Sequence, residues 1–179
     1  FSGFFNKSKC PRCNSSSRSR LIYLFLTQKT DFLKKKTILH FAPAFELYKK
    51  FKAIKSFNYI TLDLVVPWVD MNMDITSLSL EDEFWDVIIC SHVMEHVRED
   101  IKAMKELKRV LKKGGFALIL LPFDNKLEET YEDFSLMSAK DKFKHFGHWD
   151  HVRMYGRDYK KRLEKAGFKV SVLDYSKEL

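Results

Sequence analysis

The sequence predicts a three-layer α/β sandwich, in which helices cover both faces of a mostly parallel sheet. The first observation is a complete unit at residues 86–123, where a buried strand, an amphipathic helix and a second apolar strand follow one another. The second is the same alternation of strand and helix patterns in the chain before that unit. Strands joined by helices in this way run parallel and are connected by right-handed crossovers.

The N-terminal half should supply the first elements of this sandwich. A helix is expected to begin near residue 18, with Leu21, Leu24 and Phe25 on its apolar side. The next predicted elements, a strand, a short helix and a strand, occupy residues 37–42, 46–53 and 58–62.

The central unit begins with a strand over residues 86–90 and continues into a helix from Val97, whose apolar residues recur at spacings of three and four. Gly114 and Gly115 are expected to end that helix. A second strand follows over residues 116–121. Further along, a helix is expected to begin near Tyr155, and a strand over residues 169–173.

Two carboxylates at predicted strand ends point to a nucleotide-type ligand. Asp63 lies 23 residues after His40, the separation at which nucleotide-binding units place a carboxylate against ribose hydroxyls. Asp74 ends a third short extended segment. Either residue could instead be only a turn residue or a helix N-cap. Because both fall at the strand ends where ligands bind in open parallel sheets, the sequence favours the ligand role.

Five segments spread along the chain resemble class I S-adenosylmethionine-dependent methyltransferases, in particular a methyltransferase type 11-like subfamily with a Cys-rich, zinc-ribbon-like N-terminus. In chain order they are CPRCNSSSRSRLIYLFL, ILHFAPAFEL, SHVMEHV, LKRVLKKGG and FGHWDHVRMYGRDYKKRLEKAGF. The resemblance implies a Rossmann-like seven-stranded sheet, S-adenosylmethionine as the cofactor, and transfer of its methyl group to an acceptor. It also implies that the last antiparallel strand is missing from this chain.

The resemblance further implies roles for the residues at the strand ends. Asp63 would bind the ribose, Asp74 would lie near the adenine amino group, and the backbone of residues 42–44 would lie beside the amino acid moiety. Ser91 and His92 would face the methionine part. The complete predicted cofactor set is His40, Phe41, Ala42, Ala44, Asp63, Leu64, Asp74, Ile75, Ser91 and His92.

The loop after the first strand departs from the usual pattern, because HFAPAFE contains no glycine. Ala42 and Ala44 are small, but alanine does not readily take a positive φ, and Pro43 fixes its own φ. The substitution bears on how tightly a cofactor can bind more than on the fold. The absence of a G-x-G-x-x-G fingerprint argues against a nicotinamide-dependent dehydrogenase.

Residues 124–150 interrupt the alternation and are expected to shape the acceptor pocket. Four interpretations compete for the cluster that follows. A metal site lacks the remainder of a known motif. His151 could act as a general base oriented by Asp150, and Arg153 with His148 could bind an anionic acceptor. Alternatively, His151 and Arg153 only fix the loop to the next helix. His151 and Arg153 are the predicted catalytic residues, and no metal ligand is assigned.

The N-terminal segment, residues 1–17, reads as half of a zinc knuckle, and residues 18–179 as the methyltransferase-like domain with an insertion at 124–150. Cys10 and Cys13 have the two-residue spacing of a zinc knuckle, but four ligands close a tetrahedral site. The resemblance implies that a preceding C-x-x-C pair is missing, so no metal is expected to bind here. The alternative is a pair of reduced surface thiols, with Cys90 in a core strand.

Composition adds limits on location and partners. The chain has a net charge of +8, no apolar stretch long enough to span a bilayer and no secretory signal, so the cytoplasm is the expected location. The positive residues lie mostly at predicted helix ends, which favours a solvated surface and a small-molecule acceptor. An RNA methyltransferase is the main alternative, since a basic surface would suit a polyanion. A scaffold protein that lost the cofactor is the alternative from another class.

Overall fold

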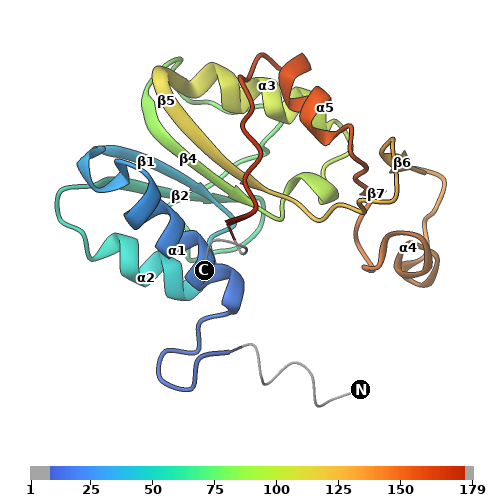
Figure 1. The fold of residues 1–179 in the computed structure, drawn as a ribbon, viewed down its shortest axis with the longest axis horizontal. Coiled ribbons are helices and arrows are strands. Elements are labelled where there is room, and N and C mark those ends of the chain that lie inside the picture. The colour runs from blue at the N-terminus through green and yellow to red at the C-terminus, as the bar shows by residue number, and fades with distance from the viewer. Residues whose placement is uncertain (1–8, 176–179) are drawn as a thin grey trace.

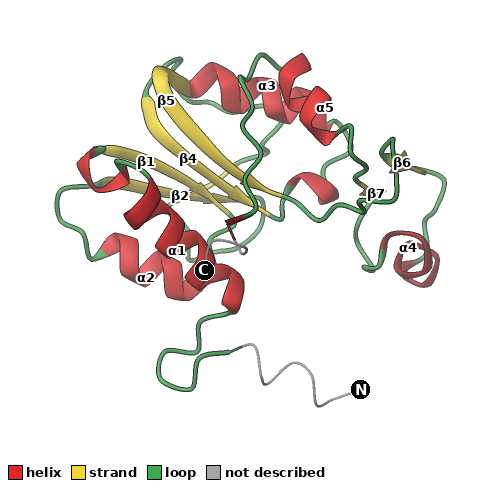
Figure 2. Cartoon of the chain, in the orientation of Figure 1, coloured by secondary structure: helices red, strands yellow, loops and turns green. Residues whose placement is uncertain are grey.

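A computed structural model describes residues 9–175, so the first part of the predicted segment 1–17 lies outside the described residues. Its centre is a five-stranded sheet in the order β3-β2-β1-β4-β5, in which every neighbouring pair is parallel (Figure 1, Figure 2). The predicted three-layer α/β fold is confirmed. In chain order the strands are β1 Thr37–Phe41, β2 Asn58–Asp63, β3 Met71–Asn72, β4 Trp85–Ser91 and β5 Leu111–Leu120.

Helices cover both faces of this sheet (Figure 1). On one face lie α1 Ser17–Lys29 and α2 Phe45–Lys52, and on the other α3 Asp100–Val110 and α5 Tyr159–Lys165. Two 3-10 turns, η2 Phe32–Lys34 and η3 Met94–His96, follow α1 and β4 respectively. Within the described residues, no helix has the length and apolar character needed to cross a membrane.

The core explains why residues 87–90 of β4 form a continuous apolar run. On β4, Val87 and Ile89 pack in the cluster beneath α1 and α2, while Ile88 and Cys90 pack in the cluster beneath α3. Successive side chains of a strand point to opposite faces, and here both faces are covered by helices. All four side chains are fully buried.

The crossover from α3 into β5 differs from the prediction. The helix ends at Val110, and Leu111 already pairs with Trp85 of β4, whereas the next regular pair is Val87 with Phe116. Residues 112–115 therefore form a bulge, in which Gly114 takes φ +78°. At Gly115 a Cβ would lie 2.7 Å from the carbonyl oxygen of Asp86. The glycines shape the start of β5 and do not end the helix.

The C-terminal part also departs from expectation. Residues 169–173 form no strand, although residues 168–175 line a cavity together with β5. The last helix, α5, begins at Tyr159 rather than near Tyr155. The residues just before it, Arg153–Met154, form the short strand β7.

The insertion forms a small lobe at one end of the sheet (Figure 1). It contains β6 Tyr131–Glu132, which pairs antiparallel with β7, and α4 Ala139–Phe146. Ser138 caps α4 by accepting a hydrogen bond from the backbone N–H of Asp141, and Gly147 at φ +75° follows the helix. The β6–β7 pair attaches this lobe to the main body.

Candidate functional site

A cavity of about 530 Å³ opens beyond the carboxyl ends of β1, β2 and β4, and we call it the sheet-edge cavity. Open parallel sheets bind ligands at this position. Of the ten residues predicted to contact a cofactor, those that line it are Phe41, Ala42, Asp63, Leu64, Asp74, Ile75 and His92. The chain beyond the strand ends contributes further lining residues, including His96 and Asp150.

The glycine-free loop adopts a conformation in which glycine is usual. Ala42, directly after β1, has φ +45°, and its backbone N–H donates a 2.7 Å hydrogen bond to the carbonyl oxygen of Leu62. An alanine in this region costs roughly 1–2 kcal/mol. His92, directly after β4, has φ +56°, and its N–H donates to Leu120 at 2.8 Å. Both strained residues line the sheet-edge cavity, and such strain clusters at ligand-binding sites.

Asp63 combines a turn role with exposure to the cavity. Its Oδ1 accepts hydrogen bonds from the backbone N–H groups of Val65 at 2.9 Å and Val66 at 3.1 Å. Among the described residues, none donates a hydrogen bond to its second carboxylate oxygen. One oxygen therefore shapes the loop after β2, and the other is available to hydroxyl donors in the cavity.

Asp74 is arranged in the same way. Its Oδ1 accepts hydrogen bonds from the backbone N–H and from the hydroxyl of Thr76, both at 2.8 Å. These two hydrogen bonds hold the pKa of Asp74 below its ordinary value, so the carboxylate is ionised at neutral pH. It offers a hydrogen-bond acceptor at the edge of the cavity.

Three predicted cofactor residues do not line the cavity. His40 points to the opposite face of β1, where Nδ1 lies 2.8 Å from the Tyr59 hydroxyl and the ring packs near Phe51. Its burial lowers its pKa to about 3, which keeps the ring neutral. Ala44 is the N-cap residue of α2 and Ser91 ends β4, and neither belongs to the lining. The expectation that His40 contacts a cofactor is therefore corrected.

A cluster of histidines and carboxylates borders the same cavity. We call Glu95, His96, His148, Asp150 and His151 the histidine cluster. The ring of His151 lies 4.8 Å from that of His96 and 4.7 Å from that of His148, measured between centroids. Asp150 joins two of them, because its Oδ2 lies 3.1 Å from Nδ1 of His96 and its Oδ1 contacts Nδ1 of His148. His96 and Asp150 reach the cavity directly.

His151 lies behind His96 rather than in the cavity lining. Its side chain is 12% exposed, and Nε2 lies 4.0 Å from a carboxylate oxygen of Glu95. Burial, and next the charge on His96, lower the pKa of His151 below its ordinary value. The ring is therefore neutral at pH 7 and able to accept a proton, the role that the sequence predicted.

Arg153 has a structural environment. Its guanidinium is fully buried and donates from Nη1 to the carbonyl oxygens of Met94, at 2.8 Å, and Val97. Nη2 donates to the carbonyl of Arg98 and Nε to the Glu132 carboxylate, each at 2.8 Å. These contacts hold the chain around η3 against the inserted lobe. The predicted contact between Arg153 and an acceptor is wrong, and the structural alternative is the one observed.

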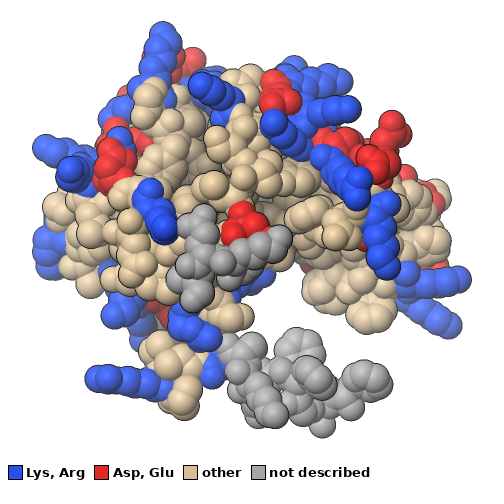
Figure 3. All heavy atoms as spheres, in the orientation of Figure 1, with Lys and Arg blue, Asp and Glu red and all other residues tan. Residues whose placement is uncertain are grey.

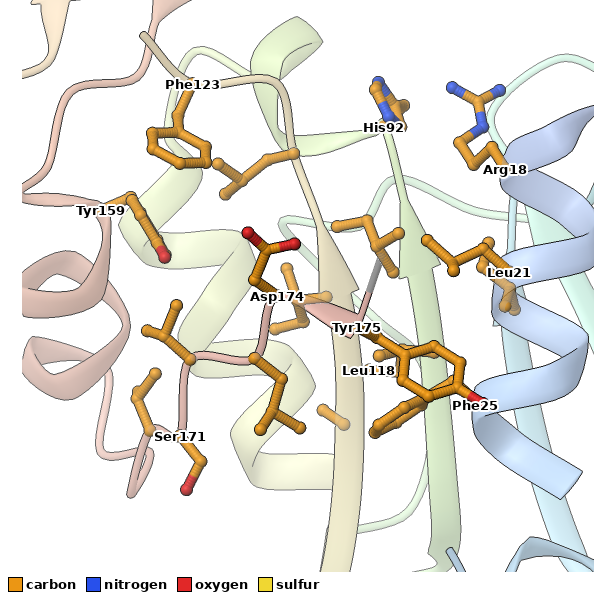
Figure 4. Close-up of a pocket in the computed structure, with 18 of the residues that line it drawn as sticks. Arg18, Leu21, Phe25, His92, Leu118, Phe123, Tyr159, Ser171, Asp174 and Tyr175 are labelled. Atoms are coloured by element: carbon orange, nitrogen blue, oxygen red, sulfur yellow. The ribbon is translucent and has the colours of Figure 1, made fainter. Parts of the chain in front are cut away.

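A second cavity, of about 830 Å³, lies along the free edge of β5, between α1 and residues 168–175 (Figure 4). Its walls are mainly apolar, and the labelled Leu21, Phe25 and Leu118 lie on them. The apolar side predicted for α1 therefore faces this cavity, while the helix buries Ser19, Ile22 and Leu26. Within residues 9–175, His92 alone lines both cavities.

The cysteine pair of the N-terminal segment lies in a tight turn. The N–H of Cys10 donates to the Ser15 carbonyl at 2.9 Å, and that of Asn14 to the Cys10 carbonyl at 2.8 Å. Cys13 is exposed, and its contact with the Ser15 hydroxyl lowers the pKa of its thiol. Neither cysteine belongs to a group of three possible metal ligands within the described residues, so a zinc-binding role for the pair stays a prediction.

The insertion, which was expected to shape the acceptor pocket, borders the sheet-edge cavity at one residue. Of residues 124–150, only Asp150 lines the sheet-edge cavity, while Phe123, just before the insertion, lines the second one. The sequence also did not pair Glu95 and His96 with His151. The chain offers no local signal for that contact, because η3 and the loop after α4 meet only through the fold.

The comparisons with known proteins agree with this geometry. Residues 44–119 match a protein-family model described as a methyltransferase domain. Comparison with curated protein sequences gave no match. A methyltransferase structure from Bacillus halodurans C-125 has a TM-score of 0.60 at 20% identity and covers 86% of this chain and 71% of its own. A SAM dependent methyltransferase from Archaeoglobus fulgidus has a TM-score of 0.57 at 14% identity, and the match covers 93% of this chain and 75% of the Archaeoglobus chain.

The same fold also carries other chemistry. The [4+2]-cyclase SpnF superposes with a TM-score of 0.65 at 14% identity, and the match covers 86% of this chain and 59% of the SpnF chain. At such identities the likenesses establish the fold, which is that of methyltransferases, and the chemistry has to be argued from the site.

Proposed function

We propose that this chain is an S-adenosylmethionine-dependent methyltransferase whose cofactor occupies the sheet-edge cavity. The observation that carries the proposal is the convergence of Asp63 and Asp74, from successive strand ends, on one cavity beside the positive-φ turn at Ala42. The segment that matches the methyltransferase domain, residues 44–119, contains both carboxylates. The scaffold alternative rests on the missing glycines, and the positive φ of Ala42, a conformation usual for glycine, supports the cofactor role over it.

The residues at the strand ends suit the parts of this cofactor. Asp63 would accept hydrogen bonds from the ribose hydroxyls, and Asp74 one from the adenine amino group. The backbone at Ala42 and His92 would lie beside the amino acid part, since both residues turn the chain at the ends of adjacent strands. Leu64 and Ile75 supply apolar surface in the same cavity.

The chemistry asked of the protein is then modest. The cofactor supplies an activated methyl group, so the protein has to hold the acceptor in line and accept a proton where the acceptor is a hydroxyl or an ammonium group. His151 would accept that proton, because its lowered pKa keeps it neutral and His96 connects it to the cavity. Arg153 would hold the loop that carries His96.

The face drawn in Figure 3 suits a small-molecule acceptor better than a nucleic acid. On the face drawn in Figure 3, Lys and Arg side chains lie around the periphery and are mixed with Asp and Glu, and they form no continuous basic stripe. A nucleic acid needs such a stripe to neutralise its phosphates. RNA remains the alternative outcome: transfer of a labelled methyl group to an RNase-sensitive fraction of a cell extract would favour it over a small molecule.

Calorimetric titration with S-adenosylmethionine and with its demethylated product tests the cofactor. The folded protein should bind at least one of them, and Asp63→Ala should weaken binding by about 1.5–3 kcal/mol, roughly 10-fold to 150-fold. If the folded wild type binds neither, the function proposed here is wrong. If Asp63→Ala binds as the wild type does, Asp63 is not a cofactor ligand.

Asp74 offers a sharper comparison, because Asp133 makes the same local turn elsewhere. Oδ1 of Asp133 accepts hydrogen bonds from the backbone N–H of Ser135 at 2.9 Å and from the Ser135 hydroxyl at 2.6 Å, and Asp133 lines neither cavity. Both Asp74→Ala and Asp133→Ala remove a turn of this type. Only Asp74→Ala should weaken cofactor binding, and an equal effect of the two variants would assign Asp74 to the turn alone.

A further inference from the structure

Glu95 is a buried carboxylate without a hydrogen-bond partner. The side chain, on η3, is 0% exposed, and neither of its carboxylate oxygens takes part in a hydrogen bond with any described residue. Burying a carboxylate without partners costs several kcal/mol, and native structures contain few such groups. A ligand that binds the oxygens would account for Glu95 in this position.

The groups that face Glu95 are imidazoles. Nε2 of His151 lies 4.0 Å from Oε1 of Glu95, and Nδ1 of His92 lies 3.0 Å from the same oxygen without hydrogen-bond geometry. One ligand atom each from Glu95, His96 and His151 lie within 4.8 Å of one another. A carboxylate and two imidazoles thus converge on one small volume.

Asp150 orients one of these imidazoles. Its Oδ2 lies 3.1 Å from Nδ1 of His96, so the proton on that nitrogen points to the carboxylate and Nε2 is left as a donor for a metal ion. Carboxylates commonly orient metal-binding histidines in this way, by accepting the hydrogen bond from the other ring nitrogen. The second oxygen of Asp150 contacts His148, which stacks on His151.

We propose that Glu95, His96 and His151 form a binding site for a divalent transition-metal ion of the zinc class, with Asp150 as the residue that orients His96. Two imidazole nitrogens and one carboxylate are a ligand set that zinc accepts, with the fourth position open. Ligand atoms about 2.0–2.2 Å from a tetrahedral zinc lie roughly 3.3 Å apart, so the three groups need to close by about 1.5 Å at most.

Because His96 lines the sheet-edge cavity, the proposed metal site would face the reaction as well as stabilise the fold. His96 and Asp150 line the sheet-edge cavity, so the open coordination position lies at its border. A water molecule or an oxygen of the acceptor would bind there, and the metal ion would lower the pKa of that bound group. With the metal bound, this group replaces His151 as the proton acceptor, because the His151 nitrogen that holds the ion no longer accepts a proton. The site needs no contact with the cofactor, and its test is separate from that of the proposed methyltransferase activity.

The alternative to a metal site is that Glu95 only forms an ion pair with a protonated His92 or His151. In that case the carboxylate stabilises the fold and no metal binds. The two interpretations differ in a measurable quantity, since a metal ion that binds only the folded protein raises its unfolding temperature, and the rise grows with the concentration of free metal.

Calorimetric titration with zinc alone, after treatment with a chelator, distinguishes them. The protein should carry Cys10→Ser and Cys13→Ser, so that zinc held by these two thiolates does not contribute to the titration. One zinc ion per chain should bind, and Glu95→Gln and His151→Gln should each weaken the affinity about tenfold or more. His145→Gln is the matched control, because His145 is exposed and contacts Tyr131 outside the cluster. It should leave the affinity unchanged.

Unfolding temperatures with and without zinc provide the second readout. Zinc should stabilise the protein that lacks the two cysteines and should stabilise Glu95→Gln much less. The proposal is overturned if the cysteine-free protein binds no zinc, or if Glu95→Gln and His151→Gln bind it as tightly as their parent. Should Glu95→Gln fail to fold, His151→Gln decides alone, because the side chain of His151 is 12% exposed whereas that of Glu95 is fully buried.

Discussion

The burial of His40 predicts a specific loss of stability in mild acid. Its ring is 1% exposed in the middle of β1, and Nδ1 meets the Tyr59 hydroxyl at 2.8 Å. Desolvation lowers the pKa of His40 to about 3, against about 6.5 for an exposed histidine. Between these two values the unfolded chain binds a proton that the folded protein does not, so stability falls as the pH falls through this range.

The magnitude follows from the two pKa values. Each pH unit below about 6.5 costs about 1.4 kcal/mol, so His40 should remove about 2 kcal/mol of stability by pH 5 and roughly 5 kcal/mol by pH 3. Small domains have about 5–15 kcal/mol in total. A single buried imidazole is therefore expected to remove a large share of the stability of a domain of this size in acid.

Urea unfolding at a series of pH values between 8 and 5 measures the effect. In His40→Asn the loss between pH 8 and pH 5 should be smaller than in the wild type by about 2 kcal/mol, whatever the variant costs at pH 8. His145→Asn, at an exposed position, should keep the wild-type dependence. An identical pH dependence in His40→Asn and the wild type would refute the reasoning, since His40 would then titrate alike in both states.

Three further predictions concern stability, each measured by urea unfolding. Arg153→Met should cost about 3–5 kcal/mol, because it removes the guanidinium donor to the Val97 and Arg98 carbonyls and leaves Arg162 as the remaining donor to Glu132, and a loss under 1 kcal/mol would contradict the buried network. Ala42→Gly should be neutral or stabilise by up to about 1 kcal/mol, since φ +45° suits glycine, whereas a clear loss would mean that the strain is absent. Gly115→Ala should cost about 1–3 kcal/mol, because its Cβ would clash with the carbonyl of Asp86, and wild-type stability would show that the bulge adapts.

The order of the central elements followed from local patterns. Residues 37–41, 58–63 and 85–91 are strands where short, mainly apolar segments predicted them, because a strand covered on both faces needs apolar residues on both sides. The ends of α3 and the fate of residues 169–173 did not follow. Pairing of Leu111 with Trp85 ended the helix, and that is a contact between distant residues.

Part of the site was predictable for the same reason. The carboxyl ends of parallel strands meet at one edge of a sheet, so the positions of Asp63 and Asp74 in the sequence were enough to bring them together. The face of the sheet to which each side chain points was harder to predict from the sequence. His40 and Phe41 are neighbours on β1 and point to opposite faces, so only Phe41 reaches the cavity.

The sequence by itself determined the parallel sheet, the edge where a ligand binds, and the carboxylates at that edge, because these depend on hydrophobic pattern and chain direction alone. The tertiary structure decided the rest. How the inserted lobe docks on η3 brings His151 beside Glu95 and buries Arg153, and the energy of that docking comes from hydrogen bonds between segments more than fifty residues apart. No local pattern encodes such contacts, since each residue type there suits a surface loop equally well until its partner is in place.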